Sequence, residues 1–182
     1  MCKLLHPKFK QYTINQIKDV VANNDKQRFK ITSFETPDGP KEFIRANQGH
    51  STKSVKIEME PVLSTEKYPT IIHGTYQKVW TSISHDPKGL RTMGRNHIHF
   101  ATGLLGEEGV ISGMRMTATV LIYIDLEKAL KDGILFFRSE NGVVLTEGLN
   151  NEGYLPKDYF LKVVTKKGDV LWEPQGVEER KD

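Results

Sequence analysis

Residues 118–124 read Ala-Thr-Val-Leu-Ile-Tyr-Ile and form the strongest strand candidate of this 182-residue chain. A run this apolar predicts a strand that is covered on both faces. Because such a strand lies inside a sheet, we take it as the centre of the fold and place the other elements around it.

The segments after this strand predict a short helix and a hairpin. Residues 126–130 have the pattern of a short helix, and two apolar runs follow at residues 134–137 and 143–145. Asn141-Gly142 lies between the two runs, and this dipeptide tolerates the positive φ values of a tight turn. The two runs are therefore predicted to pair as a β-hairpin.

The segments before the strand predict two further strands and one helix. Residues 70–73 and 96–101 are strand candidates, and residues 77–84 predict a helix. This helix is expected to turn three side chains inward: Val79, Trp80 and Ile83. Residues 60–69 contain two prolines and several polar residues, so we expect this segment to connect two lobes.

The N-terminal quarter predicts a helix followed by two strands. Residues 13–22 read as a short helix, in which Thr13 and Gln16 have the capping-box spacing. One face of this helix collects four apolar side chains: Ile14, Ile17, Val20 and Val21. Residues 28–31 and 42–45 read as strands, with a Pro-Asp-Gly-Pro turn between them. This order is compatible with the back half of a winged-helix unit, within a chain of the α+β class.

The composition excludes several classes of protein. Lys and Arg number 26 and Asp and Glu 23, so the formal net charge is only +3, and nucleic-acid binding has to come from local clustering of charge. Cys2 is the single cysteine, which rules out an intrachain disulfide and a cysteine-based zinc site. No apolar stretch approaches the roughly 20 residues that span a bilayer. We expect a monomer of the cytoplasm or nucleus that contacts no membrane.

Polar side chains beside glycines recur along the chain. Residues 44–51, Ile-Arg-Ala-Asn-Gln-Gly-His-Ser, crowd hydrogen-bond donors in a way that suits a phosphate, although a polar loop after an edge strand reads the same. His73-Gly74-Thr75 follows an apolar run, and its glycine lets a ligand approach the backbone closely. The plainer interpretation makes Thr75 the cap of the next helix.

A third stretch, residues 87–106, contains no acidic residue and five basic or imidazole side chains: Lys88, Arg91, Arg95, His97 and His99. His97 and His99 alternate along a predicted strand and therefore point to the same side. Two such histidines suggest a metal. However, the sequence offers no third ligand near them, so we expect no metal and favour a surface that binds an anion or a nucleotide.

A fourth stretch, residues 109–115, leads into the buried strand. Arg115, beside Ser112 and Gly113, is placed to hold a phosphate through its forked guanidinium, although a single arginine is more often simply exposed. The chain has no Gly-x-Ser-x-Gly, Walker or Gly-x-Gly-x-x-Gly dinucleotide pattern. The residues alone thus indicate a binder or a transferase of phosphorylated, nucleotide-like molecules.

Taken in order, these stretches resemble the NAD-dependent RNA (tRNA) 2′-phosphotransferase family. The resemblance covers nearly all of residues 8–161 and rests on seven segments: 26–29, 44–51, 73–75, 95–101, 111–115, 141–146 and 159–160. It implies a winged-helix-like N-terminal lobe over residues 1–64, truncated at its start. It also implies an ADP-ribosyltransferase-like mixed β lobe over residues 65–182. NAD would be the co-substrate, and RNA with an internal 2′-phosphate the partner.

The resemblance also implies a reaction. The 2′-phosphate of spliced tRNA attacks C1″ of NAD and expels nicotinamide, and the ribose 2″-hydroxyl then attacks that phosphate. The products are RNA with a 2′-hydroxyl and ADP-ribose 1″,2″-cyclic phosphate. Such chemistry requires positive charge at the phosphate, in agreement with the residue types above. The alternative is a non-catalytic protein that binds NAD, ADP-ribose or RNA phosphate.

Individual residues receive roles from this resemblance, position by position. Arg45 and Arg115 correspond to two essential arginines of the family that hold the transferred phosphate, and Gln48 and His50 lie beside that phosphate. The residues implied to bind NAD are His73, Gly74, Thr75, Arg95, His97, Ser112 and Asn141.

One segment departs from the family. Its members carry a Leu-Arg-His motif near their start, whose arginine and histidine complete the essential set. This chain instead opens Met-Cys-Lys-Leu-Leu-His-Pro over residues 1–7, and His6 does not match. We therefore expect a shortened chain without the first helices of the N-terminal lobe, so that apolar surface is exposed on the helix at residues 13–22.

Overall fold

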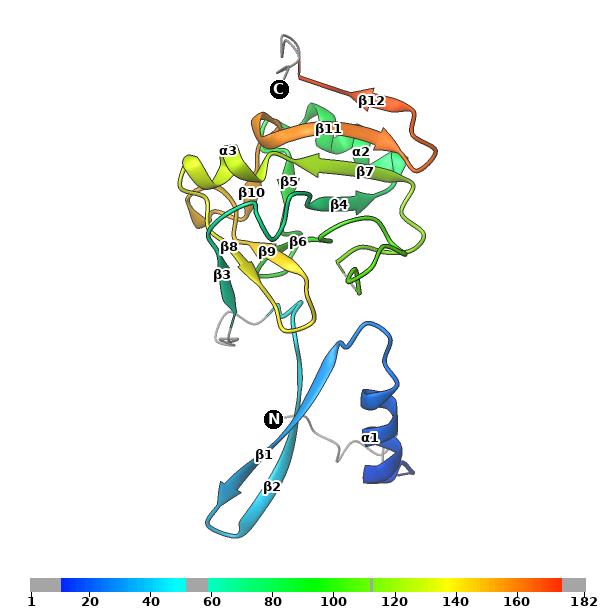
Figure 1. Cartoon of the computed structure of the whole chain (residues 1–182), viewed down its shortest axis with the longest axis vertical. Coiled ribbons are helices and arrows are strands. Elements are labelled where there is room, and N and C mark those ends of the chain that lie inside the picture. Colours follow the sequence, from blue (N-terminus) through cyan, green and yellow to red (C-terminus); the bar gives the residue numbers. More distant parts are fainter. Residues whose placement is uncertain (1–10, 52–58, 112, 175–182) are drawn as a thin grey trace.

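Two lobes follow one another along the chain in the computed structural model, which describes residues 11–51, 59–111 and 113–174 (Figure 1). The smaller, N-terminal lobe holds α1 (Ile14–Ala22), β1 (Phe29–Thr36) and β2 (Gly39–Ala46). The C-terminal lobe holds the later helices and strands. The chain is thus α+β, as predicted.

Helix α1 begins where the sequence predicts. The Oγ1 of Thr13 accepts from the Gln16 N–H at 3.3 Å, and Oε1 of Gln16 accepts from the Thr13 N–H at 2.8 Å, which confirms the capping box. No residue of α1 is buried, and on its apolar face Val20 is 64% exposed. The exposed apolar surface expected here is therefore present.

Strands β1 and β2 form a long antiparallel hairpin. Their register runs from Phe29 opposite Ala46 to Thr36 opposite Gly39, so each strand extends further toward the turn than the sequence predicts. Gly39 has a φ of +98°, a value that favours glycine and that permits the tight turn. The hairpin has no core of its own, because Asn47, just past β2, is the only buried residue within the described stretch 11–51.

The C-terminal lobe is built from short strands, the helix α2 and three shorter helical segments that follow it. In chain order its elements are β3 (Glu60–Val62), β4 (Ile72–Thr75), α2 (Gln77–His85), β5 (Leu90–Arg91), β6 (Ile98–Phe100), β7 (Val120–Ile124), α3 (Leu126–Lys131), β8 (Phe136–Arg138), β9 (Val144–Thr146), η2 (Leu149–Asn151), β10 (Tyr154–Leu155), η3 (Lys157–Tyr159), β11 (Phe160–Thr165) and β12 (Val170–Trp172). The described strands of this lobe form two four-stranded sheets, β12-β11-β7-β4 and β3-β8-β9-β6, and a small β10-β5 pair.

Strand β7 occupies an inner position, between β11 and β4. Val120, Ile122 and Ile124 are buried on one face of β7, and on the other face Leu121 is buried and Tyr123 half-buried. The strand is therefore covered on both faces, as predicted. The two sheets are joined by a pair of backbone hydrogen bonds of 2.9 Å between Ile72 and Ala101. The predicted hairpin of β8 and β9 is also confirmed.

Three expectations for this lobe are wrong. The expected connection at residues 60–69 begins with β3, which pairs with β8; a three-residue strand that contains a proline leaves little signal in a sequence. Val79 is 45% exposed, whereas Trp80 and Ile83 are buried as predicted. Thr75 does not cap α2, because the cap position belongs to Tyr76.

No helix among the described residues is long and apolar enough to cross a membrane.

Candidate functional site

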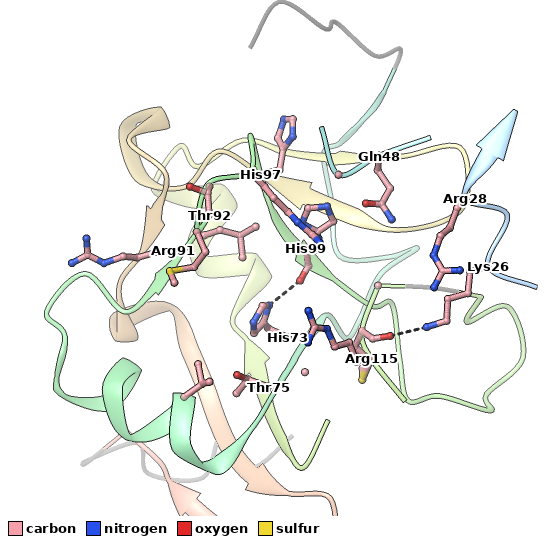
Figure 2. Close-up of a pocket in the computed structure, with 18 of the residues that line it drawn as sticks. Lys26, Arg28, Gln48, His73, Thr75, Arg91, Thr92, His97, His99 and Arg115 are labelled. Atoms are coloured by element: carbon pink, nitrogen blue, oxygen red, sulfur yellow. Dashed lines mark hydrogen bonds between the residues drawn. The ribbon is translucent and has the colours of Figure 1, made fainter. Parts of the chain in front are cut away.

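A cavity of about 720 Å³ lies where the two lobes meet (Figure 2). Both lobes contribute cations to its wall: Lys26 and Arg28 come from the α1–β1 connection, and Arg91, Arg95 and Arg115 come from the C-terminal lobe. No aspartate or glutamate is among the described residues that line it. The volume is that of a small-molecule site, and the charge of the wall favours an anion.

Buried polar contacts hold the α1–β1 connection in place. Asn47 donates from Nδ2 to the Gln27 carbonyl at 2.7 Å and from its backbone N–H to the Arg28 carbonyl at 2.8 Å. Lys26 Nζ donates to the Met114 carbonyl of the other lobe at 3.1 Å (Figure 2). Because that acceptor is uncharged, this contact positions Lys26 without neutralising its positive charge.

Asn141 fastens the β8–β9 turn to the same connection. Its Nδ2 donates to the Lys26 carbonyl at 2.9 Å, and its Oδ1 accepts from Ser139 Oγ at 2.9 Å. The side chains of Ser139 and Asn141 are almost fully buried. Asn141 does not line the cavity, so in this geometry it fixes the loop that carries Lys26.

Strand β4 forms one wall through His73, Gly74 and Thr75. A Cβ on Gly74 would lie 2.8 Å from the Cβ of Met114 and 3.0 Å from that of Ala118. The glycine is therefore required so that the segment before β7 can pack against β4. The close approach expected at Gly74 is made here by the protein's own side chains.

Two histidines of this wall are linked. His73 Nδ1 lies 3.0 Å from the His99 carbonyl, and Nε2 of His99 is buried with no hydrogen-bond partner among the described residues (Figure 2). Burial lowers the pKa of His73, and burial, helped by the neighbouring Arg95, lowers the pKa of His99 to about 4. Both rings are thus neutral at neutral pH, and they offer the cavity hydrogen bonds and no charge.

His97 lies beside this pair and is buried. Its Nε2 is 3.7 Å from Glu147 Oε1, and burial lowers its pKa more than the glutamate raises it. The described residues contain no group of three or more histidine, cysteine, aspartate or glutamate side chains that could hold a metal ion.

Arg115 lines the cavity with an exposed side chain. Nearby, the hydroxyl of Tyr76 lies 2.8 Å from Thr117 Oγ1. That hydrogen bond, together with the Arg115 guanidinium, lowers the pKa of the Tyr76 phenol. An aromatic ring and a cation are therefore presented side by side, an arrangement that suits a nucleotide with a charged end.

Arg91 is oriented by a carboxylate outside the wall. Its Nε and Nη2 both lie 2.7 Å from Asp86 Oδ2. The backbone N–H of Lys88, and then this guanidinium, hold the pKa of Asp86 below its ordinary value. Arg91 is thus a fixed cation, whereas no ion pair to Arg115 is found among the described residues.

The structure brings most of the predicted site residues to this cavity. Those that line it are Gln48, His73, Gly74, Thr75, Arg95, His97 and Arg115. His50 does not line it, and its Nε2 lies 3.2 Å from the Ala46 carbonyl. Ser112 and His6 lie outside the described residues.

Arg45, predicted to hold the transferred phosphate, does not line the cavity either. Its Nη2 lies 2.9 Å from Oε2 of Glu140, a residue of the other lobe, and its Nη1 lies 3.4 Å from Asn47 Oδ1. No local pattern in the sequence indicates a pairing of residues 45 and 140.

Several lining residues were not predicted from the sequence as site residues. They are Lys26, Arg28, Phe29, Gly49, Tyr76, Val79, Thr92, Met93 and Met114. Lys26 and Arg28 are visible in the sequence as two cations between a predicted helix and a predicted strand, and Gly49, Thr92, Met93 and Met114 lie within stretches singled out above. Tyr76 and Val79 carry no such signal and join the wall through the tertiary fold of the C-terminal lobe.

Comparison with known proteins shows extended similarity to one family. The model of the RNA 2′-phosphotransferase, Tpt1 / KptA family matches residues 2–148. A putative tRNA 2′-phosphotransferase of Schizosaccharomyces pombe is 47% identical over 165 residues, which cover 91% of this chain and 43% of that protein. The tRNA 2′-phosphotransferase 1 of Danio rerio is 45% identical over 159 residues (86% and 68%), and that of Homo sapiens is 44% identical over 155 residues (85% and 59%). The matched segment thus spans from under half to about two thirds of these relatives.

Proposed function

This chain belongs to the RNA 2′-phosphotransferase, Tpt1 / KptA family, and from that premise we propose that it transfers the internal 2′-phosphate of spliced tRNA to NAD. One observation carries the proposal: both lobes supply cations to a single cavity whose described lining has no carboxylate. A phosphate dianion and a dinucleotide with its own phosphates are the reactants that such a wall favours.

The proposed reaction has two steps. A 2′-phosphate oxygen attacks C1″ of NAD, the C1″–N bond breaks, and nicotinamide leaves with the bonding electron pair. The 2″-hydroxyl oxygen then attacks the phosphorus, the bond to the RNA 2′-oxygen breaks, and that oxygen takes up a proton. The products are RNA with a 2′-hydroxyl and ADP-ribose 1″,2″-cyclic phosphate.

The cations of the cavity have a direct part in both steps. They neutralise the phosphate so that it can approach the NAD, and they stabilise the charge on the phosphoryl oxygens during transfer. Arg115 is the candidate for this contact, because its exposed side chain lines the cavity and no carboxylate among the described residues pairs with it. The neutral imidazoles of His73 and His99 are candidates for hydrogen bonds to ribose hydroxyls.

The arrangement of the elements supports a division of labour. A helix followed by a two-stranded hairpin supports a winged-helix-like RNA lobe within residues 1–64. The β4–β7–β11 sheet, with His73, Gly74 and Thr75 facing the cavity, supports an ADP-ribosyltransferase-like NAD lobe within residues 65–182.

The test is a single-turnover reaction with NAD and a short RNA that carries one internal 2′-phosphate. We expect the 2′-phosphate to disappear and one nicotinamide to be released for each phosphate lost. Arg115→Gln should slow the reaction by about 10²-fold, because it removes a charge that stabilises the transition state. Arg138→Gln is the matched control, since Arg138 lies in β8 outside the cavity wall, and it should react like the parent chain. An unchanged 2′-phosphate, with and without NAD, would refute the proposal.

A second candidate function has one observation in its favour. Arg45 faces Glu140 and not the cavity, so a phosphate-binding group of the proposed reaction is engaged elsewhere. This favours a protein that binds NAD, ADP-ribose or RNA phosphate without transfer. Saturable binding of NAD and phosphorylated RNA without nicotinamide release would identify this function.

A further inference from the structure

A carboxylate from one lobe bridges two cations of the other. Lys30 of β1 and Arg45 of β2 are direct partners in the hairpin register, so their side chains emerge from neighbouring strands. Glu140, in the β8–β9 turn, places Oε2 2.9 Å from Arg45 Nη2 and bonds Lys30 Nζ through Oε1. One anionic group thus presents one oxygen to each cation.

The same two contacts suit a phosphate. Its oxygens can also be divided between a guanidinium and an ammonium, and it carries more charge than a carboxylate. Lys30 lies two residues beyond Arg28, which lines the cavity, so the cation pair continues the cationic wall along β1.

Arg45 keeps a contact apart from Glu140, and all three side chains of the bridge are open to solvent. Arg45 Nη1 rests against Oδ1 of Asn47, whose own side chain is buried and donates to the Gln27 carbonyl. The three side chains of the bridge are 38–44% exposed, so a solvent-borne anion can reach them. Ion pairs this exposed contribute little, and a competing dianion can displace one.

The backbone around Glu140 does not need to move for this exchange. Its neighbours Ser139 and Asn141 are almost fully buried, and Asn141 is bonded to the Lys26 carbonyl. Swinging the Glu140 side chain away would leave the turn, and the junction between the lobes, intact. Lys30, and with it Arg45, holds the pKa of Glu140 below its ordinary value, so the carboxylate is ionised and competes at neutral pH.

We propose that Lys30 and Arg45 form a docking subsite that receives the RNA 2′-phosphate before it enters the cavity for transfer, and that Glu140 occupies this subsite until that phosphate displaces it. Glu140 is then a specificity-determining residue, because only a ligand that binds both cations more tightly than a carboxylate can displace it. The subsite rests on the proposed function, because it presumes that the chain meets a phosphorylated RNA.

The test measures binding of two matched RNAs, one with an internal 2′-phosphate and one with a 2′-hydroxyl at the same position, by fluorescence anisotropy in the absence of NAD. Glu140→Gln keeps the shape of the side chain and removes its charge. We expect it to tighten binding of the 2′-phosphorylated RNA by about twofold to fivefold, the size of an exposed ion pair, and to affect the 2′-hydroxyl RNA less. Lys30→Met should weaken binding of the phosphorylated RNA selectively.

Glu42→Gln is the matched control. Glu42, in β2, is a carboxylate of similar exposure to Glu140, and it pairs with Lys18 at 2.8 Å and not with Arg45. It removes the same charge and should change binding of both RNAs equally, as a general effect of net charge would. Thermal unfolding of each variant reports whether it is folded.

Three results would overturn the inference. Glu140→Gln could leave the ratio of the two dissociation constants unchanged, or it could weaken binding of the phosphorylated RNA. In the third, neither the parent chain nor the variant distinguishes the two RNAs. Should Glu140→Gln fail to fold, an unchanged ratio in Lys30→Met would overturn it equally. Failure of the proposed function gives a different pattern, because the RNAs would be distinguished as expected while no 2′-phosphate is lost when NAD is added.

Discussion

The two lobes differ in how much apolar surface they bury. In the C-terminal lobe, Phe100, Phe136 and Phe160 are almost fully buried in a core that spans both sheets. In the N-terminal lobe, Phe34 and Phe43 stack edge to face with 56% and 45% of their surfaces exposed. The difference indicates that the C-terminal lobe carries the stability, whereas the N-terminal lobe contributes cations through a connection that the other lobe holds in place.

The largest expected effect comes from truncating one phenylalanine in each lobe. Phe136→Ala should lower the free energy of unfolding by about 3–5 kcal/mol, because it opens a cavity in a closed core. Phe34→Ala should lower it by about 0.5–1 kcal/mol, since it removes only an exposed aromatic contact. Urea denaturation followed by tryptophan fluorescence measures the loss in Phe136→Ala, as Trp80 and Trp172 belong to the C-terminal lobe, and amide hydrogen exchange in β1 and β2 measures the loss in Phe34→Ala. Equal losses in the two variants would break the contrast between the lobes.

The second effect concerns acid. The pKa of His99 is about 4 in the folded chain against 6.5 as the ordinary value, so the unfolded chain binds more protons between these pH values. Stability should therefore fall as the pH drops below 6.5, and about 3 kcal/mol should be lost once the pH is below 4.

His99→Gln should remove this part of the acid loss, as seen in unfolding curves recorded from pH 7 to 4. His85→Gln, which alters an exposed histidine of α2, should not. A His99 that titrates near 6.5 in an NMR experiment would contradict the assignment.

The third effect lies at the junction of the lobes. Asn141→Ala removes the donor to the Lys26 carbonyl and leaves Ser139 with one acceptor fewer, so the free energy of unfolding should fall by about 1–2 kcal/mol. Asn141→Ala should increase the rate of amide hydrogen exchange in the α1–β1 connection and leave the rate in β7 unchanged. Unchanged exchange in that connection would show that the lobes are joined by other contacts.

The smallest effect is confined to the N-terminal lobe. Thr13→Ala removes the cap of α1 and should cost about 0.5–1 kcal/mol of local helix stability. Because α1 buries no residue, the unfolding transition of the C-terminal lobe should keep its midpoint. The expected result is a loss of helical circular dichroism without a shift in the unfolding midpoint seen by tryptophan fluorescence. A change in both would show that the two lobes unfold as one cooperative unit.

The sequence predicted the elements whose signals are local. The capping box of Thr13 and Gln16, the Asn141-Gly142 turn and the apolar run of β7 each act within a few residues, and each is found in the structure. The role of Gly74 could not be foreseen, because the Met114 side chain that crowds it belongs to a segment forty residues away.

The candidate site divides along the same line. Arg115 and the β4 residues were visible as donors beside glycines, and they line the cavity. The partner of Arg45 was not visible, since Glu140 lies 95 residues further along the chain and reaches Arg45 only because the two lobes meet. Pairing by tertiary contact leaves no periodic signal in a sequence.

The measurement that tests the central claim most directly follows the fate of the phosphate itself. The 182-residue chain is mixed with NAD and an RNA whose internal 2′-phosphate is radiolabelled, and the products are separated by chromatography. If the cationic cavity performs transfer to NAD, the label moves into ADP-ribose 1″,2″-cyclic phosphate, and none moves when NAD is withheld. Label released as inorganic phosphate, or retained on the RNA in the presence of NAD, would contradict this account.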